Sequence, residues 1–238
     1  MIIIPDIHGR TFWKDCIKGR ENEEIIFLGD YLDPYPEENI ARRDAIENFR
    51  EIIDFKKAHM DNVILLLGNH DFIKYIFKDM YECRTDFTNM KEIEEIFKEN
   101  IDLFKVGYYK KLKYKTYLFT HAAFLKRWVE DCGEYLEEFE TPEEIIDFLN
   151  DILITDPDIF CRLINWAGWV RGGWHQCGSI IWGDIRECSF KHPQFKRYYN
   201  IYGHTQLKKP IIEKYWACLD CRRGFILNED TRKIEEIK

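Results

Sequence analysis

The chain begins MIIIPDIHGR (residues 1–10), where four apolar residues lead into a proline, an aspartate, a histidine and a glycine. Similar short apolar runs recur along the chain, at residues 24–28, 62–67, 115–120 and 199–202. Their length and nearly continuous hydrophobicity are typical of strands buried on both faces of a sheet. The pattern predicts several short sheet strands, and residues 1–4 form the first. On its own, the segment that follows fits either an Asx-type turn or a pair of metal ligands at Asp6 and His8.

The residues between the second and third runs have the spacing of an amphipathic helix. Apolar side chains recur at helical intervals between residues 37 and 59, with charged residues between them. A strand, a helix and a strand in this order predict a βαβ unit with a right-handed crossover. Residues 89–105 carry a second helical pattern, in which Phe104 is the last apolar position.

The middle of the chain departs from this βαβ regularity. Thr141 and Glu144 can form a capping box around Pro142, which predicts the start of another helix. We interpret residues of about 125–177 as a helical insertion, and residues 201–226 as an antiparallel β portion. No low-complexity linker interrupts residues 1–238, so a single domain is expected.

The composition restricts the class of protein. Of the 238 residues, 45% are hydrophobic and 33% are charged, as in soluble globular proteins. The formal net charge of -8 argues against a stable nucleic-acid complex, which usually requires a basic surface. No apolar run is long enough to span a bilayer or to form a secretory signal, so no membrane association and a cytoplasmic location are expected.

The remaining patterns are less specific. The eight cysteines are scattered, as expected of reduced thiols, and the lone pair Cys218 and Cys221 is weak evidence for a zinc or redox site. Lysines that alternate with other residues over 110–115 are typical of an exposed edge strand, although they could also steer an anionic substrate. Four tryptophans are expected mainly in the core, although they could instead line a binding groove. They are Trp166, Trp169, Trp174 and Trp182.

The same few polar residue types follow each apolar run. They are Asp6-Ile7-His8-Gly9, Gly29-Asp30-Tyr31-Leu32-Asp33, Gly68-Asn69-His70-Asp71, Thr120-His121 and Gly203-His204-Thr205. Sites in open α/β sheets form beyond the carboxyl ends of the strands, so these groups are expected to converge. Carboxylates, imidazoles and an amide oxygen suit a divalent metal of intermediate hardness. Any one of them could be a turn residue or a core histidine, but together they favour a metal site.

This series of motifs resembles the calcineurin-like metallophosphoesterase superfamily. It is most similar to the phosphoprotein phosphatase branch, in which the second motif reads GDYVDRG and the third reads GNHE. Two later segments are also similar to that branch, IIWGD at 180–184 and WACLDCRRG at 216–224. The resemblance spans residues 1–227, and the helical insertion is the least similar part.

The resemblance implies an α/β (α+β) fold with two facing mixed β-sheets flanked by helices, and a site with two divalent metal ions. Asp6 and His8 would bind the first metal, Asp30 would bridge both, and Asn69, His121 and His204 would complete the second. His70 would act as the general acid, oriented by Asp33. The last motif reads Gly-His-Thr rather than Gly-His-x-His, which fits the phosphatase branch rather than the nuclease-type relatives.

One departure from the family concerns the substrate phosphate. The protein phosphatases carry a phosphate-contacting arginine after the second aspartate of GDxxD, where this chain has Pro34. Four arginines could replace it: Arg42, Arg43, Arg171 and Arg186. We favour Arg186, because the family keeps a phosphate-contacting arginine soon after the tryptophan-aspartate segment. Arg10 and Asn69 are further candidates for phosphate contacts.

The expected activity is hydrolysis of phosphate monoesters by a metal-bridging hydroxide, as in serine/threonine protein phosphatases. The alternative substrates are dinucleoside polyphosphates or other small nucleotide phosphoesters, and either way the partner is a phosphorylated substrate. A silent binding module is a distant alternative, because every ligand position of the motifs is kept. The metals are expected to be Mn²⁺, and Fe, Zn or Ni suit the same ligands.

Overall fold

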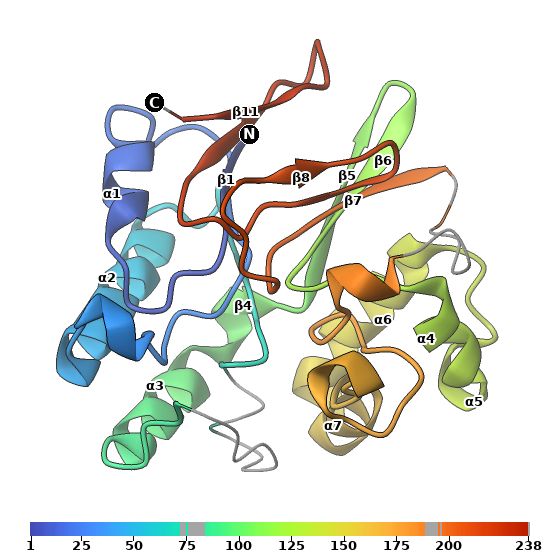
Figure 1. Ribbon diagram of the computed structural model, residues 1–238, viewed down its shortest axis with the longest axis horizontal. Helices are drawn as coiled ribbons and strands as arrows, with labels where there is room; N and C mark the ends of the chain where they lie inside the picture. Colours follow the sequence, from blue (N-terminus) through green and yellow to red (C-terminus); the bar gives the residue numbers. More distant parts are fainter. Residues whose placement is uncertain (72–74, 76–83, 189–194, 196, 238) are drawn as a thin grey trace. The chain divides into compact units, whose positions relative to one another are not determined.

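The computed structural model describes residues 1–71, 75, 84–188, 195 and 197–237 (Figure 1). Their contacts divide the chain into two compact units. The first unit contains residues Met1–Phe104 and Arg222–Lys238, and the second contains Lys105–Cys221. Each unit carries one β-sheet, so the two mixed sheets with flanking helices are confirmed. The single domain expected from the sequence stays a prediction.

The first sheet has the strand order β11-β10-β1-β2-β3-β4. Its strands are β1 (Ile2–Ile4), β2 (Ile25–Phe27), β3 (Val63–Leu66), β4 (Phe104–Lys105), β10 (Phe225–Leu227) and β11 (Ile234–Glu236). β1, β2 and β3 are parallel, in the register Ile4↔Phe27↔Leu65, whereas β10 pairs antiparallel with β1. The predicted βαβ unit is therefore present.

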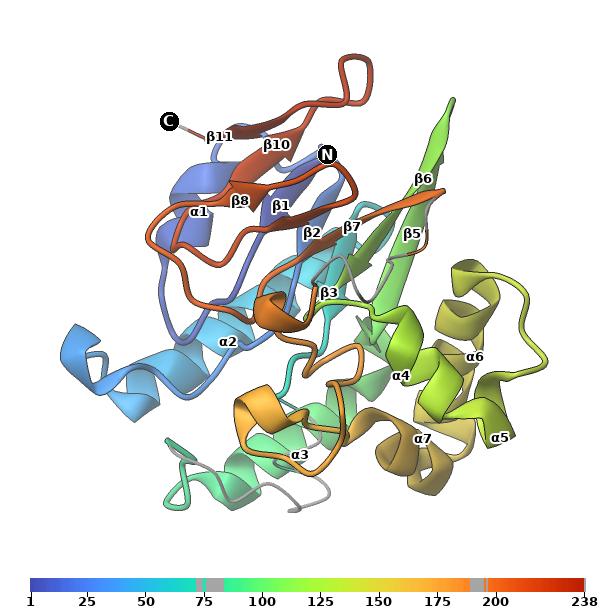
Figure 2. The same ribbon diagram turned by 45° about the vertical axis from the view of Figure 1, so that its right-hand side comes forward.

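Among the described residues, the helices of this unit are α1 (Phe12–Ile17), α2 (Arg42–Ala58) and α3 (Met90–Asn100). The described part of the unit also contains the short 3₁₀ turns η1 (Pro36–Glu38) and η3 (Ile101–Leu103). α1 and α2 lie against the sheet (Figure 1 and Figure 2), where the Trp13 ring from α1 lies 5.7 Å from that of Phe27. α2 carries Phe49, which stacks on Tyr31 with 5.1 Å between the ring centroids.

The helix expected over residues 89–105 ends earlier than the pattern suggests. α3 stops at Asn100, and the chain passes through η3 into β4, so Phe104 lies in a strand. The Phe104 ring packs 5.6 Å from Phe97 and 5.8 Å from Tyr31. Burial of each such aromatic side chain is worth about 1.5–3 kcal/mol, so this packing outweighs one further turn of helix.

The second sheet has the order β5-β6-β7-β9-β8. Its strands are β5 (Gly107–Leu112), β6 (Lys115–Thr120), β7 (Tyr198–Tyr202), β8 (Ile211–Ile212) and β9 (Trp216–Cys218). β6, β7 and β9 are parallel neighbours, whereas the pairs β5–β6 and β8–β9 are antiparallel. The lysine-rich strand β5 lies at an edge of the sheet, as predicted. The expected antiparallel portion is only partly so, because β9 is parallel to β7.

The insertion between β6 and β7 is helical, as predicted. It contains α4 (Lys126–Asp131), α5 (Gly133–Leu136), α6 (Pro142–Thr155) and α7 (Pro157–Ile164), followed by the 3₁₀ turns η4 (Trp169–Arg171) and η5 (Ile185–Glu187). The capping box of Thr141 and Glu144 at the start of α6 is present. Within the described residues, no helix is long and apolar enough to cross a membrane.

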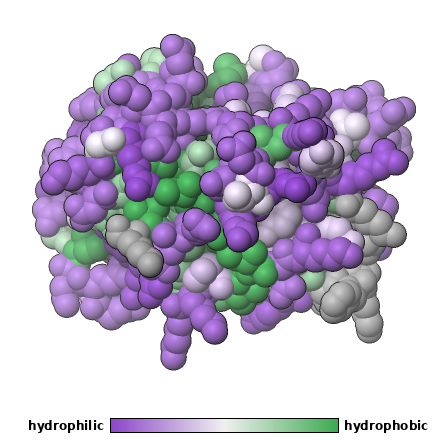
Figure 3. All heavy atoms as spheres, turned by 90° about the horizontal axis from the view of Figure 1, so that it is seen from above, coloured by the Kyte–Doolittle hydropathy of each residue, from purple (hydrophilic) through white to green (hydrophobic). Residues whose placement is uncertain are grey.

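The surface seen in Figure 3 is mostly hydrophilic, with a few apolar patches. Two tryptophans expected in the core are exposed instead, Trp169 at 67% and Trp174 at 93% of their surface. Trp169 begins the turn η4 and Trp174 follows it, and the Trp169 indole N–H donates to the Trp174 carbonyl. Trp182, by contrast, is buried. The spacing of tryptophans alone does not distinguish a turn that faces solvent from a core segment.

Candidate active site

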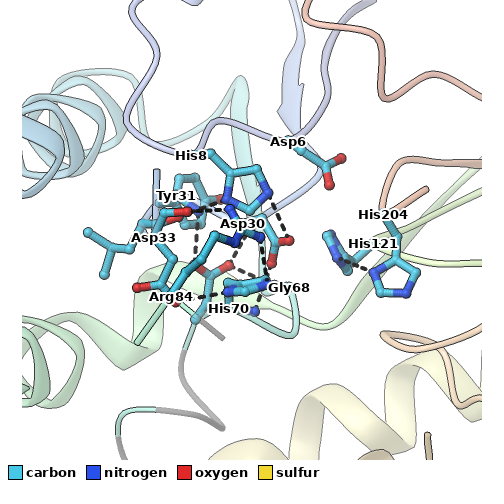
Figure 4. A network of polar contacts seen from close by, with 12 residues as sticks. Asp6, His8, Asp30, Tyr31, Asp33, Gly68, His70, Arg84, His121 and His204 are labelled. Carbon is cyan, nitrogen blue, oxygen red and sulfur yellow. Dashed lines mark hydrogen bonds and ion pairs between the residues drawn. The ribbon is translucent and has the colours of Figure 1, made fainter. Parts of the chain in front are cut away.

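Two carboxylates and one imidazole meet at the ends of β1 and β2 (Figure 4). One ligand atom from each of Asp6, His8 and Asp30 lies within 4.8 Å of the other two, and all three residues are buried. His8 Nε2 is 3.4 Å from Asp30 Oδ2. These donors, two carboxylates and an imidazole, are a common set for a divalent transition metal. The cluster is therefore a candidate metal site, as the sequence predicted.

The environment of His8 suits a metal ligand. Its Nδ1 lies 2.8 Å from the Leu32 carbonyl oxygen, so Nδ1–H donates to that carbonyl and Nε2 keeps its lone pair. Burial lowers the pKa of His8 to about 3, although the nearby Asp30 carboxylate opposes this effect. A neutral imidazole is the form that binds a metal. The residues present thus fit a metal ion.

The sheet itself brings these residues together. β1 and β2 are parallel neighbours, so the segments that follow them leave the sheet at the same edge. His8, Asp30 and Asp33 all have left-handed backbone angles, with φ of 45°, 53° and 58°. Such angles are uncommon for residues other than glycine and cost of order 1–3 kcal/mol each. Their presence at all three positions indicates that the fold holds these turns against local preference.

Gly29 allows the loops after β2 and β3 to approach each other. It has a φ of 103°, and a Cβ atom there would lie 2.6 Å from the Gly68 nitrogen. Asp71 then joins the two loops. Its buried carboxylate accepts hydrogen bonds from the backbone N–H groups of Asp30 at 2.7 Å, Tyr31 at 2.9 Å and Gly68 at 2.7 Å. The backbone of Asp30 is thereby fixed beside the metal cluster.

His70 and Asp33 form the expected pair. His70 Nδ1 lies 2.8 Å from Asp33 Oδ2, so the ring nitrogen donates its hydrogen to the carboxylate and Nε2 faces outward. The backbone N–H of His70 donates to Asp30 Oδ1 at 2.8 Å, which ties this pair to the metal cluster. Asn69, the preceding residue, is buried as well. The structure thus brings Asp6, His8, Asp30, Asp33 and His70 together in one unit.

Two residues of this site were not found from the sequence. The Tyr75 hydroxyl donates to Asp33 Oδ1, opposite the oxygen that His70 contacts. Arg84 donates from Nη1 to the Asp33 carbonyl at 2.6 Å, and its Nη2 lies 3.1 Å from His70 Nε2 (Figure 4). Neither residue follows an apolar run or belongs to a recurring motif, so no pattern marked them.

The second unit holds the other predicted ligands. His121 follows β6 and His204 follows the adjacent parallel strand β7. His204 Nδ1 lies 3.2 Å from His121 Nε2, and both side chains are buried. The backbone N–H of Gly203 donates to the His121 carbonyl at 2.8 Å, which aligns the two turns. The structure therefore brings these two histidines together at one edge of their sheet.

The arginines proposed from the sequence have carboxylate partners. Arg186 and Arg171 both bind Asp184, with Nε–O distances of 2.7 Å and 2.6 Å, and the Arg186 side chain is 63% exposed. Burial of Asp184 opposes ionisation, but hydrogen bonds from the Arg186 side chain and backbone lower its pKa overall. In the first unit, Arg10 binds both carboxylate oxygens of Glu38, at 2.9 Å and 2.8 Å.

The cysteine pair offers little support for a second metal site. Cys218 and Cys221 are both buried. Cys218 Sγ donates to the Gly203 carbonyl at 3.2 Å. Among the described residues, only the group of Asp6, His8 and Asp30 brings three candidate metal-binding side chains together.

Comparison with known proteins agrees with the geometry of the site. The chain belongs to the calcineurin-like phosphoesterase family, whose profile matches residues 2–207. It is therefore a phosphoric ester hydrolase from a metal-dependent family. The matched region includes every candidate ligand in both units.

A similar solved structure is that of a protein serine/threonine phosphatase from Saccharomyces cerevisiae with similarity to human phosphatase PP5. The match has a TM-score of 0.54 at 13% sequence identity, and it covers 100% of this chain and 79% of that one. This likeness concerns the fold. No curated protein matches the chain by sequence.

Proposed function

We propose that the protein is a binuclear metal-dependent phosphatase that hydrolyses phosphate monoesters. In this proposal Asp6, His8 and Asp30 hold one metal ion, and Asp30 also reaches the second. Asn69, His121 and His204 would be the ligands that complete the second site. The support for this is the cluster in the first unit, the histidine pair in the second and the family motifs that contain them.

The donor set favours Mn²⁺, and Fe, Zn or Ni suit the same ligands. When bound, two divalent ions supply a water nucleophile at neutral pH and positive charge for the phosphoryl oxygens. The protein's own contribution is to hold the ligands rigidly, through the Asp71 contacts to the Asp30 loop and the Leu32 carbonyl on His8. Oriented and buried ligands of this kind are the usual requirement for such a site.

The observation that carries the proposal is the contact between His70 and Asp33 beside the metal cluster. Asp33 accepts the Nδ1 hydrogen, so a proton on Nε2 points away from the carboxylate. A histidine fixed in this way is suited to protonate the oxygen that leaves the phosphorus atom. A binding module without turnover would have no use for this arrangement.

The substrate class that we propose is a phosphorylated protein or peptide, as for the serine/threonine phosphatase with the similar fold. A dinucleoside polyphosphate or another nucleotide phosphoester is the alternative. Arg186, Arg10 and Asn69 stay candidates for contacts to the phosphate. The absence of a stable nucleic-acid complex and of membrane association, and the cytoplasmic location, also stay predictions.

The general-acid role of His70 can be tested with leaving groups of different basicity. His70→Ala should slow hydrolysis of an alkyl or phenyl phosphate by about 10²–10⁴-fold, the usual contribution of general acid catalysis. With p-nitrophenyl phosphate, whose leaving group needs little protonation, the loss should be much smaller. His59→Ala, at the end of α2, serves as the matched control and should leave both rates unchanged. Equal losses for both substrates would contradict the proposed role of His70.

A further inference from the structure

The chain lacks an arginine at the position of Pro34, and Arg10, Arg171 and Arg186 each pair with a carboxylate. Glu38 binds Arg10 through both of its carboxylate oxygens. In the second unit, Asp184 forms ion pairs with both Arg186 and Arg171. A guanidinium that already binds a carboxylate must give up that ion pair, or share it, before it can bind a phosphate.

Arg84 differs from these arginines in its partners. Its Nη1 donates to the Asp33 backbone carbonyl at 2.6 Å, and its Nη2 lies 3.1 Å from His70 Nε2. Its guanidinium carbon lies 3.8 Å from the centre of the Tyr35 ring. No carboxylate in the described part of the chain forms an ion pair with it. The charge of Arg84 is thus held by neutral groups.

Arg84 lies beside the side chain that we propose as the general acid. His70 Nε2 is the atom from which the leaving oxygen would receive its proton, and Arg84 Nη2 lies within hydrogen-bond distance of it. The Tyr35 ring also contacts His8 edge-on, with 4.9 Å between the ring centroids. The same tyrosine therefore lies against both a metal-site residue and the arginine.

The backbone of Arg84 is also constrained. Its φ of 77° lies in the left-handed region, as do those of His8, Asp30 and Asp33. Its hydrogen bond to the Asp33 carbonyl uses one of the five N–H donors of a guanidinium, and the contact of Nη2 with His70 Nε2 occupies at most one more, when Nε2 carries no proton; donors are left for the oxygens of an anion. Arginine binds phosphate oxygens through two parallel N–H groups, a geometry that lysine cannot reproduce.

We propose that Arg84 binds the phosphoryl group of the substrate and replaces the arginine that is missing at Pro34. This inference rests on the proposed function, because it places the phosphoester beside His70 and the metal cluster. Tyr35 and the Asp33 carbonyl hold the guanidinium in position, so that it meets a phosphate with little loss of side-chain entropy. It assigns the phosphate contact to the first unit, rather than to Arg186 in the second.

The test compares Arg84→Met and Arg84→Lys with the wild-type protein, all loaded with Mn²⁺. Methionine keeps most of the length of the side chain without its charge, and lysine keeps the charge without the planar fork. The measurements are the KM for p-nitrophenyl phosphate and the inhibition constant of orthophosphate. Arg50→Met is the matched control, because Arg50 is an exposed residue of α2 that pairs with Glu92.

We expect Arg84→Met to raise both constants by about 10- to 150-fold, the range for hydrogen bonds to a charged group. Arg84→Lys should recover part of the loss, and Arg50→Met should match the wild type. If Arg84→Met leaves the inhibition constant of orthophosphate unchanged, the inference is wrong. It is also wrong if the methionine and lysine variants lose phosphate binding equally and unfold at a lower temperature, because the role would then be structural.

The proposed function and this inference can fail separately. A wild-type protein that hydrolyses no phosphate monoester would contradict the proposed function. In that case, calorimetric titration of the Mn²⁺-loaded wild type and Arg84→Met with orthophosphate still decides the inference. Weaker binding to the variant would support it, and equal binding would overturn it.

Discussion

The carboxylate of Asp71 is predicted to be a main stabiliser of the metal-binding loops. It is fully buried and accepts three backbone N–H groups, two at Oδ2 from Asp30 and Gly68 and one at Oδ1 from Tyr31. Asp71→Asn keeps one acceptor oxygen. If this oxygen takes the place of Oδ2, the new NH₂ group faces the Tyr31 N–H, and a buried donor loses its partner.

The magnitude follows from these contacts. One unsatisfied buried N–H costs about 1–3 kcal/mol, and the two hydrogen bonds that remain each lose about 1 kcal/mol when the acceptor is no longer charged. Relief from burying a charge offsets part of this cost. A net loss of about 2–4 kcal/mol should lower the unfolding temperature by roughly 5–15 °C in a chain of this length.

The assay is thermal unfolding of chelator-stripped protein, followed by circular dichroism. Stripping the protein separates the effect on the loops from any effect of bound metal. Asp54→Asn, on the exposed side of α2, is the control and should unfold with the wild type. If Asp71→Asn also unfolds at the wild-type temperature, the Asp71 carboxylate does not hold the two loops together, and the reasoning is refuted.

Two further changes test the surroundings of the site. Tyr75→Phe removes the hydroxyl that donates to Asp33 and accepts the Asp86 N–H. We therefore expect the free energy of unfolding to fall by about 1–3 kcal/mol and kcat to fall with it. An unchanged kcat in a variant whose circular dichroism spectrum shows it to be folded would mean that His70 needs no such support. Asp184 has a lowered pKa in the folded state, so its ion pairs stabilise the protein above its ordinary pKa of 3.8 and this contribution is lost as the pH falls through the lower folded value. Asp184→Asn should therefore lower the unfolding temperature at neutral pH, and the unfolding temperature of the variant should decrease less than that of the wild type as the pH falls. If the two unfolding temperatures differ by the same amount from neutral pH to pH 2.5 (roughly one unit below that pKa), the ion pairs of Asp184 do not stabilise the protein in this way.

Much of the site could be predicted because its residues follow buried strands. The apolar runs mark where β1, β2, β3, β6 and β7 end, and the residue types that follow them are those of metal ligands. Parallel pairing then brings the turns of each sheet to one edge. The capping box at Thr141 was equally local, and the structure contains it.

The contacts that the sequence did not reveal are long-range. Tyr75 and Arg84 reach Asp33 across 42 and 51 residues, and Asp71 reaches the Asp30 backbone across 41. No local pattern encodes such partners. The end of α3 differs from the helical pattern for a related reason, since Phe104 continues the helical spacing but packs as part of a strand.

The most direct test of the account is a titration of chelator-stripped protein with Mn²⁺, following hydrolysis of p-nitrophenyl phosphate against metal bound. The account predicts no hydrolysis without metal, and full activity only when two Mn²⁺ ions are bound per chain. Asp30→Asn, which changes the residue proposed to bridge the ions, should lose both the pairing of the metals and the activity. Full activity with a single ion, or none with Mn²⁺, Fe²⁺, Zn²⁺ or Ni²⁺, would contradict the proposed two-metal phosphatase.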